Sequence, residues 1–85
     1  MYQLSHMDEA FLMRLELTDN ITQLHMLNGT TIDALKGEGI LVIEDLLKLE
    51  PIAFAGIDDI DYSEMEKLEA IYRFIFRSSY ENLHG

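Results

Sequence analysis

The densest group of side chains able to do chemistry is the acidic run Asp58-Asp59-Ile60-Asp61-Tyr62-Ser63-Glu64. Carboxylates at alternate positions can ligate calcium, but an EF-hand loop also needs a central glycine and a terminal bidentate glutamate. This run lacks the glycine, and its acids do not follow that spacing. We therefore expect no calcium site, and we interpret the acids first as charges that complement the positive end of a helix.

The other residues with ligand or catalytic chemistry are scattered. His6, His25 and His84 share no spacing that would place two imidazoles on one helix face. No serine lies in a G-x-S-x-G elbow, and the chain has no cysteine and no glycine-rich phosphate loop. We therefore expect no metal, no cofactor and no enzymatic activity.

The charge balance restricts the class of partner. Six basic residues face sixteen acidic ones, which gives a net charge of −10. Binding to a nucleic-acid backbone or to an anionic membrane requires clustered lysine and arginine, so we expect neither partner. A basic patch on another protein fits this charge. The alternative is that the acids only keep a small domain dispersed in water.

The length and composition indicate one domain with its own core. The chain has 85 residues, of which 48% are hydrophobic, near the lower limit for an unaided core. No apolar run approaches the ~20 residues that cross a bilayer, and the N-terminus lacks a signal-peptide pattern. With no cysteine to pair, we expect a cytoplasmic protein.

Apolar residues recur at helical spacing throughout, and no stretch alternates long enough to indicate a strand. We expect a first helix that starts at Ser5 or Asp8. A later helix follows the Asn28-Gly29 turn and is capped by Thr30 or Thr31. The pattern predicts an all-α, compact bundle of five or six short helices.

The second half of the chain carries clear helix boundaries. Gly37 or Gly39 ends the helix that follows residue 30. Pro51 suits the first position of another short helix. Ser63 and Glu66 form the sequence pattern of a capping box at the start of the last helix. We divide the chain into residues 1–7, a flexible N-terminus or a cloning remnant, residues 8–78, one helical domain, and residues 79–85, a frayed tail.

The last helix is apolar on more than one face. Phe74, Phe76 and Tyr80 widen its apolar arc beyond what one core contact needs. These three residues are candidates for a second interface, with a homodimer or another partner. The alternative is that the first helix folds back and covers them.

Residues 27–68 resemble a known family. Leu27 and the run Leu35-Lys36-Gly37-Glu38-Gly39-Ile40-Leu41-Val42-Ile43-Glu44-Asp45-Leu46 match a pattern of the C-terminal domain of the bacterial RNA polymerase α subunit. They are equally similar to the acidic repeats at the C-terminus of the elongation factor NusA. Both are compact domains on a helix-hairpin-helix-like core. The resemblance implies that fold and a setting in transcription.

The departures from this family matter for function. Where the α domain has a DNA-gripping arginine this chain has Thr30, and where it has a contacting asparagine this chain has Asp33. The phosphate-binding hairpin becomes Asp61-Tyr62-Ser63-Glu64. Carboxylates there would compete for the amides that bind phosphate. The resemblance to the NusA repeats, which bind protein, therefore fits better than DNA binding.

SAM domains are a second resemblance. Glu44-Asp45-Leu46-Leu47 and Phe54-Ala55-Gly56-Ile57, followed by a long last helix, look like the pattern of these five-helix modules. This resemblance implies self-association, through one acidic and one basic surface.

We therefore expect an acidic protein-interaction domain, without DNA binding, that contacts RNA polymerase or an associated factor. The predicted contact residues surround the start of the last helix and are Asp58, Asp59, Asp61, Tyr62 and Glu64. Two alternatives remain, a SAM-like self-associating module and an acidic DNA mimic that blocks a nucleic-acid-binding protein.

Overall fold

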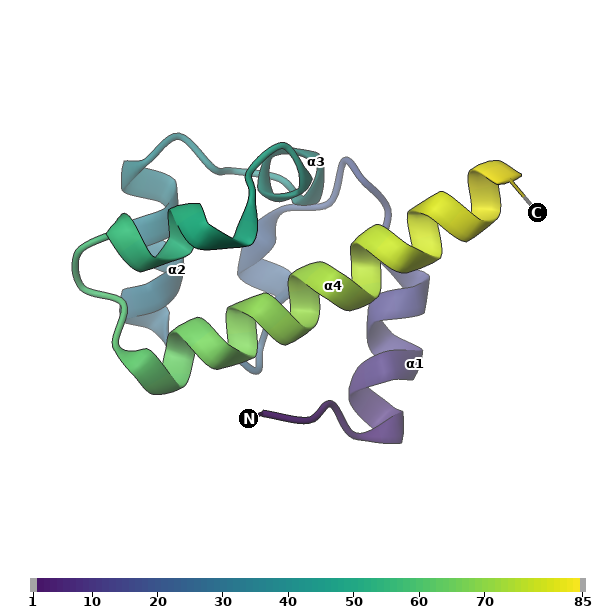
Figure 1. Ribbon diagram of the computed structural model, residues 1–85, viewed down its shortest axis with the longest axis horizontal. Helices are drawn as coiled ribbons and strands as arrows, with labels where there is room; N and C mark the ends of the chain where they lie inside the picture. Colours follow the sequence, from purple (N-terminus) through teal and green to yellow (C-terminus); the bar gives the residue numbers. More distant parts are fainter. Residues whose placement is uncertain (1, 85) are drawn as a thin grey trace.

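A long C-terminal helix, α4 (Tyr62–His84), spans the computed structural model, and the other elements pack along it (Figure 1). The structure describes residues 2–84, and their side chains as far as residue 79. The stripe of Leu68, Ile71, Tyr72 and Ile75 is buried, as a helical period predicts. With 23 residues, α4 agrees with the long last helix noted in the sequence and is not one of the short helices expected for the bundle.

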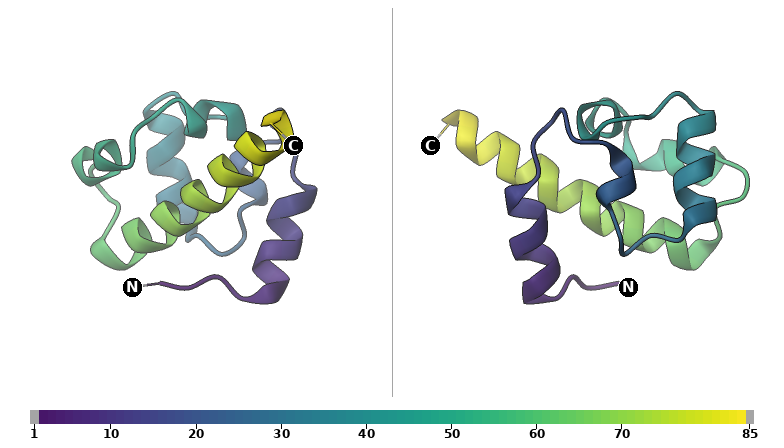
Figure 2. Two further views of the ribbon diagram at one scale, coloured as in Figure 1. Left: turned by 45° about the vertical axis from the view of Figure 1, so that its right-hand side comes forward. Right: turned by 180° about the vertical axis from the view of Figure 1, so that it is seen from behind.

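Three more α-helices and two 3-10 helices precede α4. In chain order they are α1 (His6–Arg14), η1 (Ile21–Gln23), α2 (Gly29–Gly37), α3 (Ile43–Leu47) and η2 (Pro51–Gly56). α1 crosses the C-terminal half of α4, whose last turns project beyond it (Figures 1 and 2). The described residues 2–84 contain no strand, so a compact, mostly helical fold is confirmed. The radius of gyration is 12.0 Å, as expected for a compact chain of this length.

Of the two predicted starts of α1, Ser5 and Asp8, the structure has Ser5 as the cap. The Ser5 hydroxyl accepts a hydrogen bond from the Asp8 amide at 3.0 Å, and the Asp8 carboxylate accepts one from the Ser5 amide at 3.3 Å. This reciprocal pair is a capping box. α1 therefore begins within the segment 1–7, and at the other end α4 continues through residues 79–84 of the expected tail.

The end of α2 is a Schellman motif built on Gly39. The Ile40 amide donates to the Leu35 carbonyl and the Gly39 amide donates to the Lys36 carbonyl, each at 3.0 Å. Gly39 has φ of +85°, a left-handed conformation that side chains with a Cβ disfavour. Ile40 is buried after the turn, so of the two predicted end residues Gly39 makes the reversal.

Replacing Gly39 by alanine is expected to lower the free energy of unfolding by about 1 kcal/mol. An added Cβ meets no atom within 4 Å at Gly39 or at Gly37, so the loss comes from backbone strain alone. Gly37→Ala is the matched control. It should raise the free energy of unfolding by up to about 0.5 kcal/mol, because Gly37 lies in the helix and alanine favours a helix more than glycine does. Urea denaturation followed by circular dichroism measures the stability of both variants. An equal change in the two variants would contradict the role of Gly39.

Two distant segments are joined by backbone hydrogen bonds. Asn20 and Val42 form an isolated antiparallel bridge. The amides of Ile43 and Glu44 donate to the carbonyls of Asp19 and Leu17, each at 2.9 Å. These bonds fasten the chain that precedes η1 to the start of α3.

The core is one continuous apolar cluster contributed by every element. Phe54 of η2 is 1% exposed, and its ring meets that of Tyr72 edge to face at 5.7 Å. No buried side-chain nitrogen or oxygen among the described residues lacks a hydrogen-bond partner. The buried hydrophobic residues are Leu12, Ile21, Leu24, Leu27, Ile32, Leu35, Ile40, Ile43, Leu46, Phe54, Leu68, Ile71, Tyr72 and Ile75.

Candidate protein-binding surface

The loop between η2 and α4, residues 57–61, presents acidic side chains to solvent. Asp58, Asp59 and Asp61 are all exposed. Asp59 has φ of 71°, and aspartate tolerates this left-handed region better than most residues with a Cβ. Three of the five predicted contact residues therefore lie together on one exposed loop, which we call the acidic loop.

Asp61 also caps α4. Its carboxylate accepts a hydrogen bond from the Glu64 amide at 2.8 Å. One of the free amides in the first turn of α4 is therefore already bonded to a carboxylate of the same chain. The capping box predicted for Ser63 and Glu66 is wrong, because α4 begins at Tyr62. The cap lies two residues earlier in the sequence.

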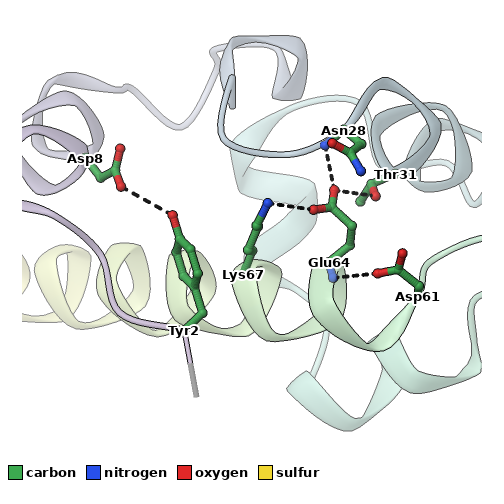
Figure 3. A network of polar contacts seen from close by, with 7 residues as sticks. All are labelled: Tyr2, Asp8, Asn28, Thr31, Asp61, Glu64 and Lys67. Carbon is green, nitrogen blue, oxygen red and sulfur yellow. Dashed lines mark hydrogen bonds and ion pairs between the residues drawn. The ribbon is translucent and has the colours of Figure 1, made fainter.

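Glu64 points into the molecule (Figure 3). Its carboxylate accepts hydrogen bonds from the Asn28 amide at 2.6 Å and the Thr31 hydroxyl at 2.8 Å, and it pairs with the Lys67 ammonium at 3.1 Å. Asn28 precedes α2, and Thr31 lies in its first turn. Glu64 therefore joins the start of α4 to the start of α2.

The same contacts correct two predictions. Thr30 and Thr31 do not cap α2, which starts at Gly29 after Asn28; Thr31 is fully buried against Glu64. Glu64 is 3% exposed and does not belong to a contact surface. Burial would raise the pKa of Glu64, but the Asn28 amide, the Thr31 hydroxyl and the Lys67 ammonium together lower it below its ordinary value.

Tyr62 is 71% exposed but faces along α4. A hydrogen bond from its hydroxyl to the Glu66 carboxylate, with the charge of that group, raises the pKa of Tyr62. Tyr62 lines a groove of about 850 Å³ between α4 and residues 2–4. It therefore borders the acidic loop without being part of it.

Of the residues predicted for a second interface, Phe74 and Phe76 do not share one face of α4. Phe74 is half-buried and lines the same groove as Tyr62. Phe76 is 50% exposed and stacks on Tyr72, with ring centroids 5.8 Å apart. Two positions apart on a helix, Phe74 and Phe76 point to opposite sides. The side chain of Tyr80 lies outside the described residues.

The described part of the chain holds no group of three or more histidine, cysteine, aspartate or glutamate side chains that could bind a metal ion. No helix among residues 2–84 has the length and apolar character needed to cross a membrane.

Comparison with family models, with curated proteins and with solved structures found no match to this chain. The resemblances described above therefore rest on the sequence patterns quoted for them.

Proposed function

We propose that the chain is a non-enzymatic protein-interaction domain whose acidic loop binds a basic surface on another protein. The observation that carries this proposal is the exposure of Asp58, Asp59 and Asp61 on one loop. Asp58 and Asp59 form no ion pair with a described residue, so their charges are available to a partner.

The partner is a protein and not a nucleic acid. A helix N-terminus binds phosphate through amides that have no other acceptor. At α4 the Asp61 carboxylate already accepts from the Glu64 amide, and Asp58 and Asp59 add negative charge beside it. A phosphate group would therefore be repelled at the position where the hairpin of the polymerase α domain offers amides and lysines.

The setting we propose is transcription, with RNA polymerase or an associated factor as the partner. Support comes from the resemblance of residues 27–68 to the polymerase α and NusA domains, in which η2, the acidic loop and α4 would correspond to the helix-hairpin-helix-like unit. In that alignment the hairpin that binds DNA becomes Asp61-Tyr62-Ser63-Glu64, which begins at the last residue of the acidic loop. The loop charges would mainly accelerate encounter and set specificity.

Neutralising the acidic loop is expected to weaken binding to purified bacterial RNA polymerase about tenfold, with a smaller dependence on salt. The variant Asp58→Asn, Asp59→Asn, Asp61→Asn suits this test because asparagine tolerates the left-handed backbone and retains the helix cap. Biolayer interferometry over a range of salt concentrations measures the affinity.

The matched control removes the same charge elsewhere. Asp33→Asn, Glu38→Gln and Glu50→Gln neutralise three exposed acids and should leave the affinity within about twofold of the wild type. Equal loss in both variants would show that only net charge matters and would contradict the acidic loop as the site. Absence of polymerase binding by the wild-type protein would contradict the transcription setting.

A further inference from the structure

A second hollow lies at the opposite end of α4 from the acidic loop. It has a volume of about 540 Å³ and is formed by the end of α1, the turn that follows it, the start of α3 and the C-terminal half of α4. The end of α4 projects beyond α1 on this side of the fold (Figures 1 and 2). We call this hollow the α1–α4 groove. Its lining residues are Leu12, Met13, Leu15, Glu16, Leu17, Thr18, Ile43, Ile75, Ser78 and Ser79.

The lining of the groove is mainly apolar and reaches the surface. Leu12, Ile43 and Ile75 form its floor and belong to the core. Met13 and Leu17 form the rim, and they are 71% and 43% exposed. Exposed apolar side chains that border an apolar hollow favour contact with a partner, and a methionine can adapt its shape to the partner.

The charges at the groove are acidic. Among the side chains that the structure describes, Glu16 is the only charged one that lines it. The Asp19 carboxylate lies beside it, since it accepts a hydrogen bond from the Glu16 amide at 2.8 Å. Arg14 and Arg77 are next to lining residues in the sequence, but Arg77 lines the other groove, beside Tyr62. The whole chain carries −10. A second copy of the chain would bring the same negative charge to this groove.

We propose that the α1–α4 groove binds a basic amphipathic helix of another protein. The apolar stripe of such a helix would cover Leu15, Leu17 and Ile75, as in other helix-in-groove complexes. Its lysine or arginine side chains would meet Glu16 and Asp19. This site is separate from the acidic loop, because residues 62 and 75 of α4 are about 20 Å apart along the helix.

The test uses the full chain and a synthetic amphipathic helical peptide made of leucine and lysine as the probe. Isothermal titration calorimetry measures the affinity, and NMR shift changes locate the site. We expect Leu17→Asp to weaken binding about tenfold, because a carboxylate replaces an apolar contact at the rim. Met13→Asp is a second variant at an exposed position, should Leu17→Asp loosen the turn after α1.

Controls separate the groove from general charge attraction. Met7→Asp adds the same charge on α1 at a residue that is 83% exposed and outside the groove, and it should bind the peptide like the wild type. A peptide of the same composition with its leucines scrambled should bind at least about tenfold more weakly, since a lost apolar stripe exceeds 1.4 kcal/mol. Equal binding of both peptides would overturn the proposal. Self-association of the wild type in sedimentation, abolished by Leu17→Asp, would also overturn it and assign the groove to a second copy.

Discussion

Replacing Phe54 by alanine is expected to lower the free energy of unfolding by about 3–5 kcal/mol. Phe54 is the buried residue of η2, and its ring meets Tyr72 on α4. The total free energy of unfolding of a small domain is only about 5–10 kcal/mol. The variant should therefore be largely unfolded at modest urea concentrations. The measurement is urea denaturation followed by circular dichroism.

Ile52 provides the control for this prediction. It lies on the same 3-10 helix but is 79% exposed, so Ile52→Ala should change the free energy of unfolding by no more than about 0.5 kcal/mol. A loss of similar size at both positions would mean that η2 as a whole, and not the Phe54 ring, is what the core requires.

Replacing Glu64 by alanine should cost about 2–4 kcal/mol of stability, because it leaves the buried Thr31 hydroxyl and the Asn28 amide without their acceptor. Glu64→Gln should cost less, since an amide oxygen can still accept from both donors while the ion pair with Lys67 is lost. Thermal or urea denaturation ranks the two variants. A Gln variant less stable than the Ala variant would contradict this account of the site.

The lowered pKa of Glu64 fixes the sign of its pH dependence. A carboxylate with a folded-state pKa below its unfolded value contributes its full stability above the unfolded pKa of about 4.3. That contribution is lost as the pH falls through the lower pKa of the folded state. The stability difference between wild type and Glu64→Gln should therefore be constant above about pH 5 and shrink below about pH 4.3. A constant difference in acid would show that the ionised form is not what the site prefers.

The sequence predicted the parts of the fold that depend on neighbouring residues. The Ser5 cap, the reversal at Gly39 and the proline start of η2 each follow from local chemistry, and each is present. The long apolar stripe of α4 follows from periodicity in the same way.

The errors at the starts of α2 and α4 share one cause, which is contact between residues far apart in the chain. Asp61-Tyr62-Ser63-Glu64 allows two overlapping caps, one from Asp61 and one from Ser63. The structure uses Asp61, and with the helix set this way Glu64 reaches Asn28 and Thr31, 36 and 33 residues earlier in the chain. In this contact Thr31 is buried and does not cap α2, and Glu64 is buried and does not lie on the predicted contact surface. Local sequence rules carry no information about such a pair.

The acidic loop was largely foreseeable, whereas the α1–α4 groove was not. Exposure of Asp58 and Asp59 follows from a run of charges in a turn. The groove brings together Leu15, Ile43 and Ile75, which belong to three separate parts of the chain. The crossing of α1 over α4 and the backbone bonds between residues 17–20 and 42–44 together make them neighbours.

The backbone bonds between residues 17–20 and 42–44 also have a consequence for how the molecule opens. They close a loop of chain that contains η1 and α2, whereas α1 lies outside this loop and packs chiefly on α4. Local unfolding follows such divisions, because a segment outside a closed loop can detach without breaking it. α1 can therefore open as a separate unit, while the amide protons of Ile43 and Glu44 are released to solvent only when the closed loop itself comes apart.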